Sequence, residues 1–297
     1  MEFHFDFVRR WRIWFAASGT LILIAILALA IRGLHYGIDF TGGTQLDLRF
    51  QHPTASAPIR AVLDSRRLGG SSIVFVGQGH REVLITTPAI SETQRTQLLS
   101  SLRRRVGPFE AVSTSRVSSV IGQETERTAL LAVLLATAGI ILYITLRFEW
   151  RFALSAIIAL IHDVLITVGL IALIHITLSQ YFVMAVLTIF GYSVNDTIII
   201  FDRIRENLNR QKRGEPLEDL VNRSLNQVLI RSINTSSTVL LALAAILIFG
   251  GATIKDFALT MLLGVFFGTY SSIFIASPLW LLWRKRQAAP APRQRLA

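Results

Sequence analysis

The chain has 297 residues, of which 52% are hydrophobic and only 16% are charged. This balance excludes an ordinary soluble enzyme of one or two domains and is typical of a protein with several membrane-spanning helices. The net charge of +11 does not indicate nucleic-acid binding, because the basic residues gather at the ends of apolar runs and not along one soluble face.

Apolar runs long enough to cross about 30 Å of hydrocarbon as helices occur in six places. We predict spans at Ile13–Ile31, Thr128–Leu146, Phe152–Ile174, Tyr181–Phe201, Ser232–Ile254 and Phe257–Trp283. The first run has a second interpretation as a cleaved signal peptide, because Ala28-Leu29-Ala30 resembles a cleavage site. Its uncharged core is longer than that of a typical signal peptide, which favours a retained anchor.

Basic residues flank these spans mainly on one side of the membrane. They precede the first span, bound the turn between the second and third, and follow the fourth and the sixth. The opposite short connections, His175–Gln180 and Lys255–Asp256, contain one lysine and no arginine between them. The positive-inside rule therefore predicts that both termini are cytoplasmic.

The spans divide the chain into four parts. We expect residues 1–33 to form the cytoplasmic N-terminus and the first span, and residues 34–127 to form an external domain. Residues 128–284 are expected to form a five-helix bundle with a cytoplasmic loop at 202–230, and residues 285–297 a cytoplasmic basic tail.

The external region predicts an α+β domain. QLDLRFQ at Gln45–Gln51 alternates as a half-buried strand does. Further strands are predicted at Ser71–Val76, Arg81–Thr86 and Phe109–Val117, and helices at Ala57–Arg67 and Ser91–Arg105, where Ser91 begins a capping-box pattern. The order β-α-β-β-α-β is ferredoxin-like. The region's histidines lack the spacing of a metal site, and we predict neither a metal nor a cofactor.

Two glycine patterns indicate close backbone approaches. Gly42 and Gly43 follow Asp39-Phe40-Thr41 in a stretch that lacks the Lys-Ser/Thr of a phosphate-binding loop, so we expect them to give a tight path into the first strand. Gly264 and Gly268 form a GxxxG in the sixth span, which predicts close helix packing. Leu217 to Val228 has one apolar face, interpreted as an interfacial helix or as a plain amphipathic connector.

Polar and small residues form one face on each of three spans. The predicted faces are Ser155, Ala159, Asp163 and Thr167 in the third span; Thr188, Gly191, Tyr192, Asn195 and Asp196 in the fourth; and Arg231, Asn234, Thr235, Thr238, Ala242 and Ala245 in the fifth. The most economical arrangement points all three faces at one another. Asp196 and Arg231 are then expected to meet.

Ionisable groups inside a membrane usually have a function, so Asp196 and Asp163 are candidate proton carriers. The alternative for both is a structural role as a buried hydrogen-bonded anchor. Arg231 keeps its proton and is expected to be a fixed counter-charge, unless it only extends to the membrane surface. Asn195, Thr235 and Thr238 are candidate members of the same site, and His162 is either a proton relay or a local hydrogen-bonding group.

Several stretches resemble one protein family. They are LHYGIDFTGGT at Leu34–Thr44, VIGQE at Val120–Glu124, FEWRFALSAIIALIHDV at Phe148–Val164, GYSVNDTIIIFDRIRENL at Gly191–Leu208 and IRSINTS at Ile230–Ser236. They occur, in this order, in the SecF family, whose members pair with SecD in bacterial preprotein translocation and belong to the RND superfamily. The family motif covers Gly37, Asp39, Phe40, Gly42 and Gly43.

The resemblance implies a bacterial inner-membrane protein that uses proton flow to promote translocation through SecYEG and release on the external side. It also implies SecD, the preprotein and accessory proteins similar to YajC and YidC as partners, and no nucleic acid. The family's essential aspartate and arginine fall on Asp196 and Arg231, although the usual Arg-Thr is here Arg231-Ser232. Such a subunit catalyses no covalent chemistry.

Three other functions are compatible with parts of the pattern. An RND-type small-molecule exporter shares the proton chemistry but uses about twice as many spans and two external domains. An intramembrane aspartyl protease needs two aspartates, but its Gly-x-Gly-Asp is absent, because Ser193-Val194-Asn195 precede Asp196. A non-catalytic assembly factor is distinguished by activity that does not depend on a proton gradient.

Overall fold

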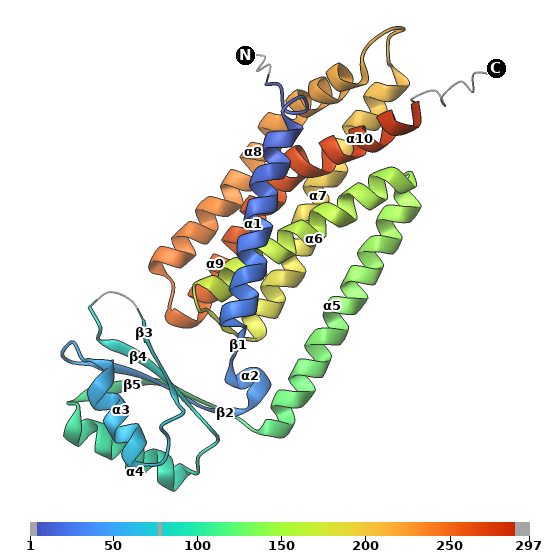
Figure 1. Cartoon of the computed structure of the whole chain (residues 1–297). Coiled ribbons are helices and arrows are strands. Elements are labelled where there is room, and N and C mark those ends of the chain that lie inside the picture. Colours follow the sequence, from blue (N-terminus) through green and yellow to red (C-terminus); the bar gives the residue numbers. More distant parts are fainter. Residues whose placement is uncertain (1–4, 77–78, 289–297) are drawn as a thin grey trace, which may run out of the picture. The chain divides into compact units, whose positions relative to one another are not determined.

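The computed structural model describes residues 5–76 and 79–288 (Figure 1). These residues form two compact units, which we describe separately. A helical unit comprises the described residues of 1–35, 133–176 and 181–297, and an α+β unit comprises those of 36–132 together with 177–180.

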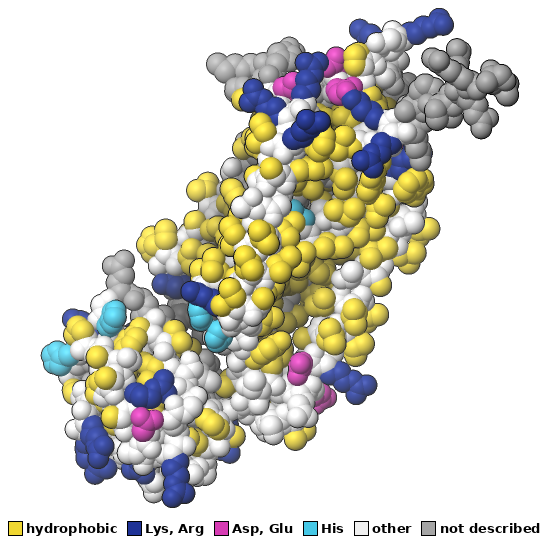
Figure 2. Space-filling view, in the orientation of Figure 1, with side chains coloured by type: hydrophobic (Ala, Val, Ile, Leu, Met, Phe, Trp, Pro, Cys, Tyr) yellow, Lys and Arg dark blue, Asp and Glu magenta, His cyan; other side chains and the backbone are white. Residues whose placement is uncertain are grey.

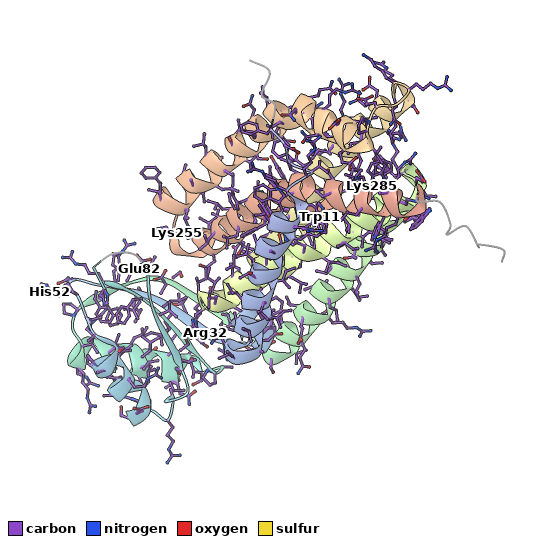
Figure 3. All side chains as sticks on the ribbon, turned by 45° about the horizontal axis from the view of Figure 1, so that its top comes forward. Trp11, Arg32, His52, Glu82, Lys255 and Lys285 are labelled. Atoms are coloured by element: carbon purple, nitrogen blue, oxygen red, sulfur yellow. The ribbon has the colours of Figure 1, made fainter. Side chains whose placement is uncertain are left out.

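Among the described residues, six helical segments are long and apolar enough to cross a membrane, as the sequence predicts. They are α1 (Trp11–Arg32), α5 (Ser119–Arg147), α6 (Trp150–Leu173), α7 (Gln180–Asn209), α8 (Leu217–Phe249), and a sixth span in which α9 (Ala252–Ser271) continues through the π-helical turn η1 (Ser272–Ala276) into α10 (Ser277–Ala288). Hydrophobic side chains cover the middle of the helical unit, and lysines and arginines gather near one end (Figure 2). Trp11 and Lys285 lie toward this basic end, whereas Arg32 and Lys255 lie toward the other (Figure 3).

One predicted detail of the helical unit was wrong. The fifth span ends at Phe249 and not at Ile254, because Gly250 and Gly251 interrupt the helix before α9 begins. The stretch expected as a cytoplasmic connection at 202–230, with a helix from its middle onward, is helical except for residues 210–216. The apolar face of α8 near its start packs into the bundle core through Leu220, Val221 and Leu225, which supports the interpretation as an amphipathic connector.

The GxxxG of the sixth span brings α9 directly against α7. A Cβ atom built on Gly264 would overlap the side chain of Ile189. A Cβ on Gly268 would lie 3.0 Å from the Cβ of Ser193, which is tighter than ordinary contact. The predicted close packing is confirmed, and it fixes which side of each helix faces the other.

Replacing Gly264 by Ala is expected to destabilise the helical unit, because overpacking a well-filled contact costs about 1–3 kcal/mol. We expect the Tm of the full chain in detergent to fall by several degrees. Gly139→Ala in α5 is the matched control, since no described atom lies within 4 Å of the Cβ that it would gain. Equal Tm values for the two variants would contradict the close α7–α9 contact.

The α+β unit has the predicted ferredoxin-like order, with strands β2 (Gly43–Phe50), β3 (Ser72–Val76), β4 (Glu82–Thr87) and β5 (Phe109–Val117) and helices α3 (Ser56–Ser65) and α4 (Glu92–Arg105). The strands run β3-β4-β2-β5 in one sheet with antiparallel neighbours. Leu46, Leu48, Ile59, Leu63 and Leu98 belong to the core between the sheet and the helices. Ser91 and Gln94 form the predicted capping box at the start of α4.

A buried carboxylate weakens this unit at neutral pH. Asp47 of β2 is 7% exposed, and its Oδ1 has no hydrogen-bond partner among the described residues. Burial, followed by the negative charge of Glu82, raises the pKa of Asp47 above its usual 3.8, and the nearby Arg49 acts in the opposite direction. Because the folded state binds this proton more tightly than the unfolded chain does, its stability falls as the pH rises from 3.8 through the folded pKa.

Asp47→Asn is therefore expected to slow hydrogen exchange of the β2 amides in the full chain at pH 7 by about fivefold, which corresponds to about 1 kcal/mol. The difference should vanish below the usual pKa of an aspartate, where Asp47 itself is protonated. Glu110→Gln, at an exposed position on the neighbouring strand β5, is the control and should leave the exchange rates unchanged. Faster exchange in Asp47→Asn would show that the charge is stabilising.

Candidate functional site

Asp163 lies near the middle of α6 and is completely buried. His162 Nδ1 lies 2.9 Å from Oδ1, and the hydroxyls of Ser193 and Ser271 donate to Oδ2 at 2.6 and 2.7 Å. The two serines come from α7 and α9, so this carboxylate joins three spans. Hydrogen bonds of this length to a carboxylate are strong. His162 bonds to Asp163 locally, and its Nε2 has no partner among the described residues.

Asp196 of α7 is also buried, at 3% exposure, but its contacts are longer. The hydroxyls of Ser232 and Ser236 of α8 lie 3.4 and 3.5 Å from its two oxygens. Hydrogen bonds between hydroxyl and carboxylate oxygens usually measure about 2.5–3.0 Å, so both contacts are weak. Ser236 also shares a 2.6 Å hydrogen bond with Thr269 of α9. Asp196 is therefore the less well satisfied of the two buried carboxylates.

The predicted polar face of α6 points inward, since Ser155, Ala159, Asp163 and Thr167 are all buried. The predicted face of α8 points outward, which is a correction. The exposed side chains of α8 include Arg231, Asn234, Thr235, Thr238, Ala242 and Ala245. Each residue turns a helix by about 100°, so Ser232 and Ser236 point toward the carboxylate of Asp196 and their neighbour Arg231 does not.

Asp196 and Arg231 are not in direct contact, although the charge of Arg231 is close enough to act on Asp196. Within residues 5–76 and 79–288, no ion pair or hydrogen bond joins the two side chains. Arg231 lines a cavity of about 370 Å³ together with Ile199, Asp202 and Glu206 of α7. Asp202 already pairs with Arg147 at 3.2 Å, and Glu206 with Arg203 at 2.6 Å.

Asn195 is exposed on α7, one turn before Ile199, and does not reach inward beside Asp196. We call Asn195, Arg231, Thr235 and Thr238 the open polar face, because all four side chains are exposed and lie on adjacent membrane-spanning helices. Polar groups facing hydrocarbon are costly. This face is therefore suited to contact polar groups of another protein.

The π-helical turn η1 lies where the sixth span meets both carboxylate sites. Ser271 donates to Asp163, and the hydroxyl of the next residue, Ser272, lies 2.7 Å from that of Thr197. Thr197 follows Asp196 directly in α7. Single π turns inside α-helices are frequent at functional sites, because they place one residue out of register. A change in this turn would alter contacts next to both Asp163 and Asp196.

The stretch Gly37 to Gly43 forms a joint within the α+β unit. Gly37 N donates to Leu178 O at 2.8 Å, and Asp39 Oδ2 accepts from Gln180 N, the first residue of α7, at 2.9 Å. Gly42 and Gly43 have φ angles of 72° and 144°, which favour glycine. A Cβ on Gly42 would lie 2.7 Å from Ser119 Cα at the start of α5, and one on Gly122 would lie 2.6 Å from Phe40 O. The predicted tight path into the first strand is confirmed.

Comparison with known proteins identifies the family. Residues 98–286 match the model of the protein export membrane protein SecD/SecF C-terminal region, and residues 27–54 match that of the SecD/SecF GG motif. The protein translocase subunit SecF of Sebaldella termitidis is 40% identical over 282 residues, which cover 94% of this chain and 91% of the relative. SecF of Acidaminococcus fermentans is 41% identical over 288 residues, covering 95% and 98% of the two chains. The chain belongs to the SecF family.

Solved structures agree with this assignment. The crystal structure of SecDF, a translocon-associated membrane protein from Thermus thermophilus, is similar with a TM-score of 0.88 and 37% identity. The match covers 96% of this chain but 39% of the SecDF chain. A SecDF structure in a super-membrane-facing form matches at the same identity with a TM-score of 0.71. The glycine joint described above lies within the stretch matched by the family's GG motif.

The inward hydroxyl groups were missed by the sequence analysis of this SecF-family chain. Five hydroxyl side chains contact the two carboxylates or each other, and none of the five was predicted as a site residue. They are Ser193 and Ser271 at Asp163, Ser232 and Ser236 at Asp196, and Thr269 at Ser236. A signal for Ser232 and Ser236 was present, because serines four residues apart share one helix face. Gly264 and Gly268 identified the packed side of the sixth span. Ser271 lies on the same side, so its hydroxyl could have been predicted to face the bundle.

Gly42→Ala is expected to loosen the joint, because Ala at a positive φ adds strain and its Cβ would also overlap Ser119. We expect amide exchange at the start of α5 to accelerate at least about tenfold, which corresponds to about 1.4 kcal/mol. Gly33→Ala separates the two causes, since Gly33 has a φ of 64° and no described atom within 4 Å of a built Cβ. Equal acceleration in both variants would show that strain alone matters.

Proposed function

We propose that this chain is the SecF-type half of a SecD–SecF pair in the bacterial inner membrane. In this proposal the pair uses proton movement to promote preprotein translocation through SecYEG and release on the external side. Accessory proteins similar to YajC and YidC are further partners in the proposal. The observation that carries it is a weakly held intramembrane carboxylate, Asp196, next to a polar face that is open in this chain.

The open polar face supports a partner with membrane-spanning helices. The side chains of Arg231, Thr235 and Thr238 are exposed, although the charge of Arg231 also acts on Asp196. A polar surface of this kind in a membrane is stabilised when another protein covers it. The similar solved protein is named SecDF, and this chain matches 39% of its length, which leaves room in that protein for a second part. A SecD-type chain is therefore the partner that we propose.

The proton step follows from the weak contacts of Asp196 with α8. Its hydroxyl contacts with Ser232 and Ser236 are long, so they compensate an ionised carboxylate poorly inside a membrane. Proton uptake removes its charge, and approach of a cation such as Arg231 or a partner group compensates it. Alternation between these states changes the packing of α7 against α8. Each proton that crosses the field carries about 2.3 kcal/mol per 100 mV, which can bias such a change.

The glycine joint offers a route from the helices to the α+β unit. Through the joint, residues 37–43 contact the starts of α5 and α7, the helix that carries Asp196. We propose that movement of these helices shifts the α+β unit, which lies on the external side by the distribution of basic residues, while it holds emerging polypeptide. The two different TM-scores against SecDF structures support the existence of more than one form in this family.

The test is preprotein export into inverted vesicles that contain SecYEG and the SecD-type partner, with and without this chain. We expect this chain to increase export several-fold only while a proton gradient is present. An increase that persists after the gradient is collapsed would indicate an assembly factor. Gradient-dependent dye transport without any effect on export would indicate a small-molecule exporter.

A further inference from the structure

A groove of about 800 Å³ lies between α1, α8 and the sixth span in the helical unit. Most of its wall is aromatic or aliphatic and includes Trp14, Leu229, Ile233, Leu240, Phe266 and Phe274. Ile233 and Phe266 are 47% and 54% exposed, so the groove opens laterally from membrane-spanning helices. Its volume is in the range of about 300–1,000 Å³ found for small-molecule sites.

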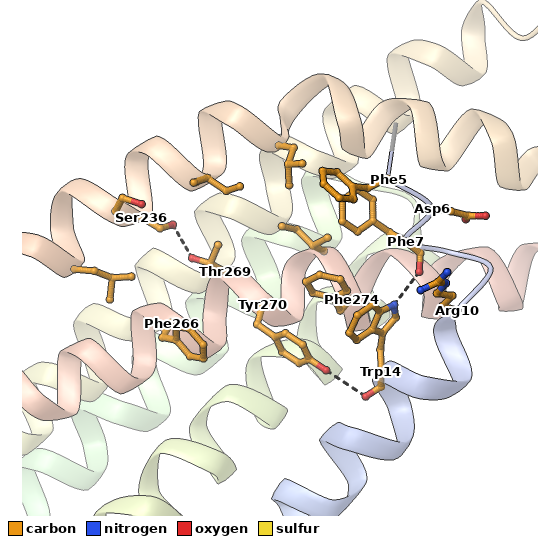
Figure 4. A pocket seen from close by; sticks show the side chains of 15 residues that line it. Phe5, Asp6, Phe7, Arg10, Trp14, Ser236, Phe266, Thr269, Tyr270 and Phe274 are labelled. Carbon is orange, nitrogen blue, oxygen red and sulfur yellow. Dashed lines mark hydrogen bonds between the residues drawn. The ribbon is translucent and has the colours of Figure 1, made fainter. Parts of the chain in front are cut away.

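The two ends of the groove differ in chemistry. Arg10 and Asp6 lie at one end, and the hydrogen-bonded pair of Ser236 and Thr269 lies toward the other (Figure 4). Arg9 lies 3.6 Å from Asp6 and also pairs with Asp219 at 3.0 Å, so the carboxylate of Asp6 is compensated. Arg10 has no acidic partner among the residues that the structure describes. Within the described residues, the groove therefore has a guanidinium without an acidic partner at its basic end.

The groove is separate from the open polar face. Ile233, Ser237 and Leu240 line the groove, and at about 100° per residue they lie on the side of α8 roughly opposite Arg231 and Thr238. A partner that covers the open polar face therefore leaves the groove accessible from the membrane.

We propose that this groove holds one acyl chain of an anionic phospholipid, with the lipid phosphate against Arg10. An acyl chain matches the aromatic and aliphatic wall, and a phosphate complements the Arg10 guanidinium, for which residues 5–76 and 79–288 offer no acidic partner. Basic pockets between membrane-spanning helices bind anionic lipid headgroups in this way. The surrounding bilayer supplies the ligand at high concentration, and the lateral opening provides its path of entry.

The bound chain also covers a wall of the Asp196 site. Ser236 and Thr269 line the groove, and Ser236 contacts Asp196 Oδ2. Lipid in the groove thus keeps water away from this hydroxyl pair on the side opposite the partner. The lipid site itself does not depend on the proposed proton coupling, because its residues and its ligand can be tested without transport.

The test is native mass spectrometry of the full chain in detergent, titrated separately with phosphatidylglycerol and phosphatidylcholine. Arg10→Gln is expected to weaken phosphatidylglycerol binding about fivefold. Phosphatidylcholine binding should weaken less, because its choline cation offsets the attraction between its phosphate and Arg10. Arg12→Gln is the matched control, since Arg12 is exposed, lies over the Trp11 ring and does not line the groove. Ser237→Trp fills the groove and should abolish binding of both lipids in the groove.

Elution volume and circular dichroism identify variants that fold, and Ser237→Leu replaces Ser237→Trp if the larger side chain prevents folding. Equal affinity of the wild type for the two lipids, or equal losses in Arg10→Gln and Arg12→Gln, would overturn the headgroup assignment. Unchanged lipid binding in a folded groove-filling variant would overturn the groove as the site. Loss of gradient-dependent export with normal lipid binding would leave the lipid site standing and would bear only on the proposed function.

Discussion

Asp196→Asn is expected to abolish the proton-gradient-dependent part of preprotein export while association with the SecD-type partner persists. Asparagine has nearly the same shape and still accepts hydrogen bonds from Ser232 and Ser236, but it cannot take up or release a proton. The contacts that it replaces are long, at 3.4 and 3.5 Å, so we expect a loss of about 1 kcal/mol or less in unfolding free energy. Export in vesicles, with the gradient present and collapsed, measures the effect.

Asp202→Asn is the matched control for this experiment. Asp202 lies on the same helix six residues later, but its side chain is 40% exposed and pairs with Arg147 at 3.2 Å. Exposed ion pairs contribute about 1 kcal/mol or less, so the variant should export like the wild type. If Asp196→Asn keeps a gradient-dependent increase, Asp196 is an anchor and the coupling group is Asp163 or belongs to the partner.

Asp163→Leu is expected to have the largest effect on stability in the helical unit. Leucine has a similar volume but leaves the buried donors of Ser193 and His162 without their acceptor, whereas Ser271 keeps a hydrogen bond to Gly268 O at 3.2 Å. Each unsatisfied buried group costs about 1–3 kcal/mol, so we expect a loss of about 3 kcal/mol. Urea unfolding of the full chain in detergent, compared with Asp196→Leu, measures the difference.

Asp163→Asn separates stability from proton transfer at this position. The amide oxygen still accepts from Ser193 and Ser271, so most of the network should survive. A stable Asp163→Asn chain that has lost the gradient response would identify Asp163 as a second coupling group. A stable chain with normal export would establish Asp163 as the anchor that holds α6, α7 and α9 together. A smaller stability loss in Asp163→Leu than in Asp196→Leu would contradict the difference in hydrogen-bond length.

The sequence by itself was sufficient for those features that depend on local patterns. The six spans follow from apolar runs, because a helix must satisfy its own backbone in hydrocarbon wherever it stands in the bundle. The ferredoxin-like order, the Ser91 cap and the inward face of α6 also follow from patterns within one element. Gly264 and Gly268 predicted a packed helix face, but the pattern did not indicate which helix packs against them.

The tertiary structure alone decided which polar face of α8 points toward Asp196. Periodicity shows that Arg231, Thr235 and Thr238 share a face, but a face covered by another protein and one turned toward the chain's own bundle have the same period. Helix rotation is set by packing against neighbours, here by contacts of α8 such as that of Ser236 with Thr269 of α9, which join residues distant in sequence. Because that rotation brings Ser232 and Ser236 inward, the contacts of Asp196 with α8 are two long hydroxyl contacts, and Arg231 is left on the open polar face.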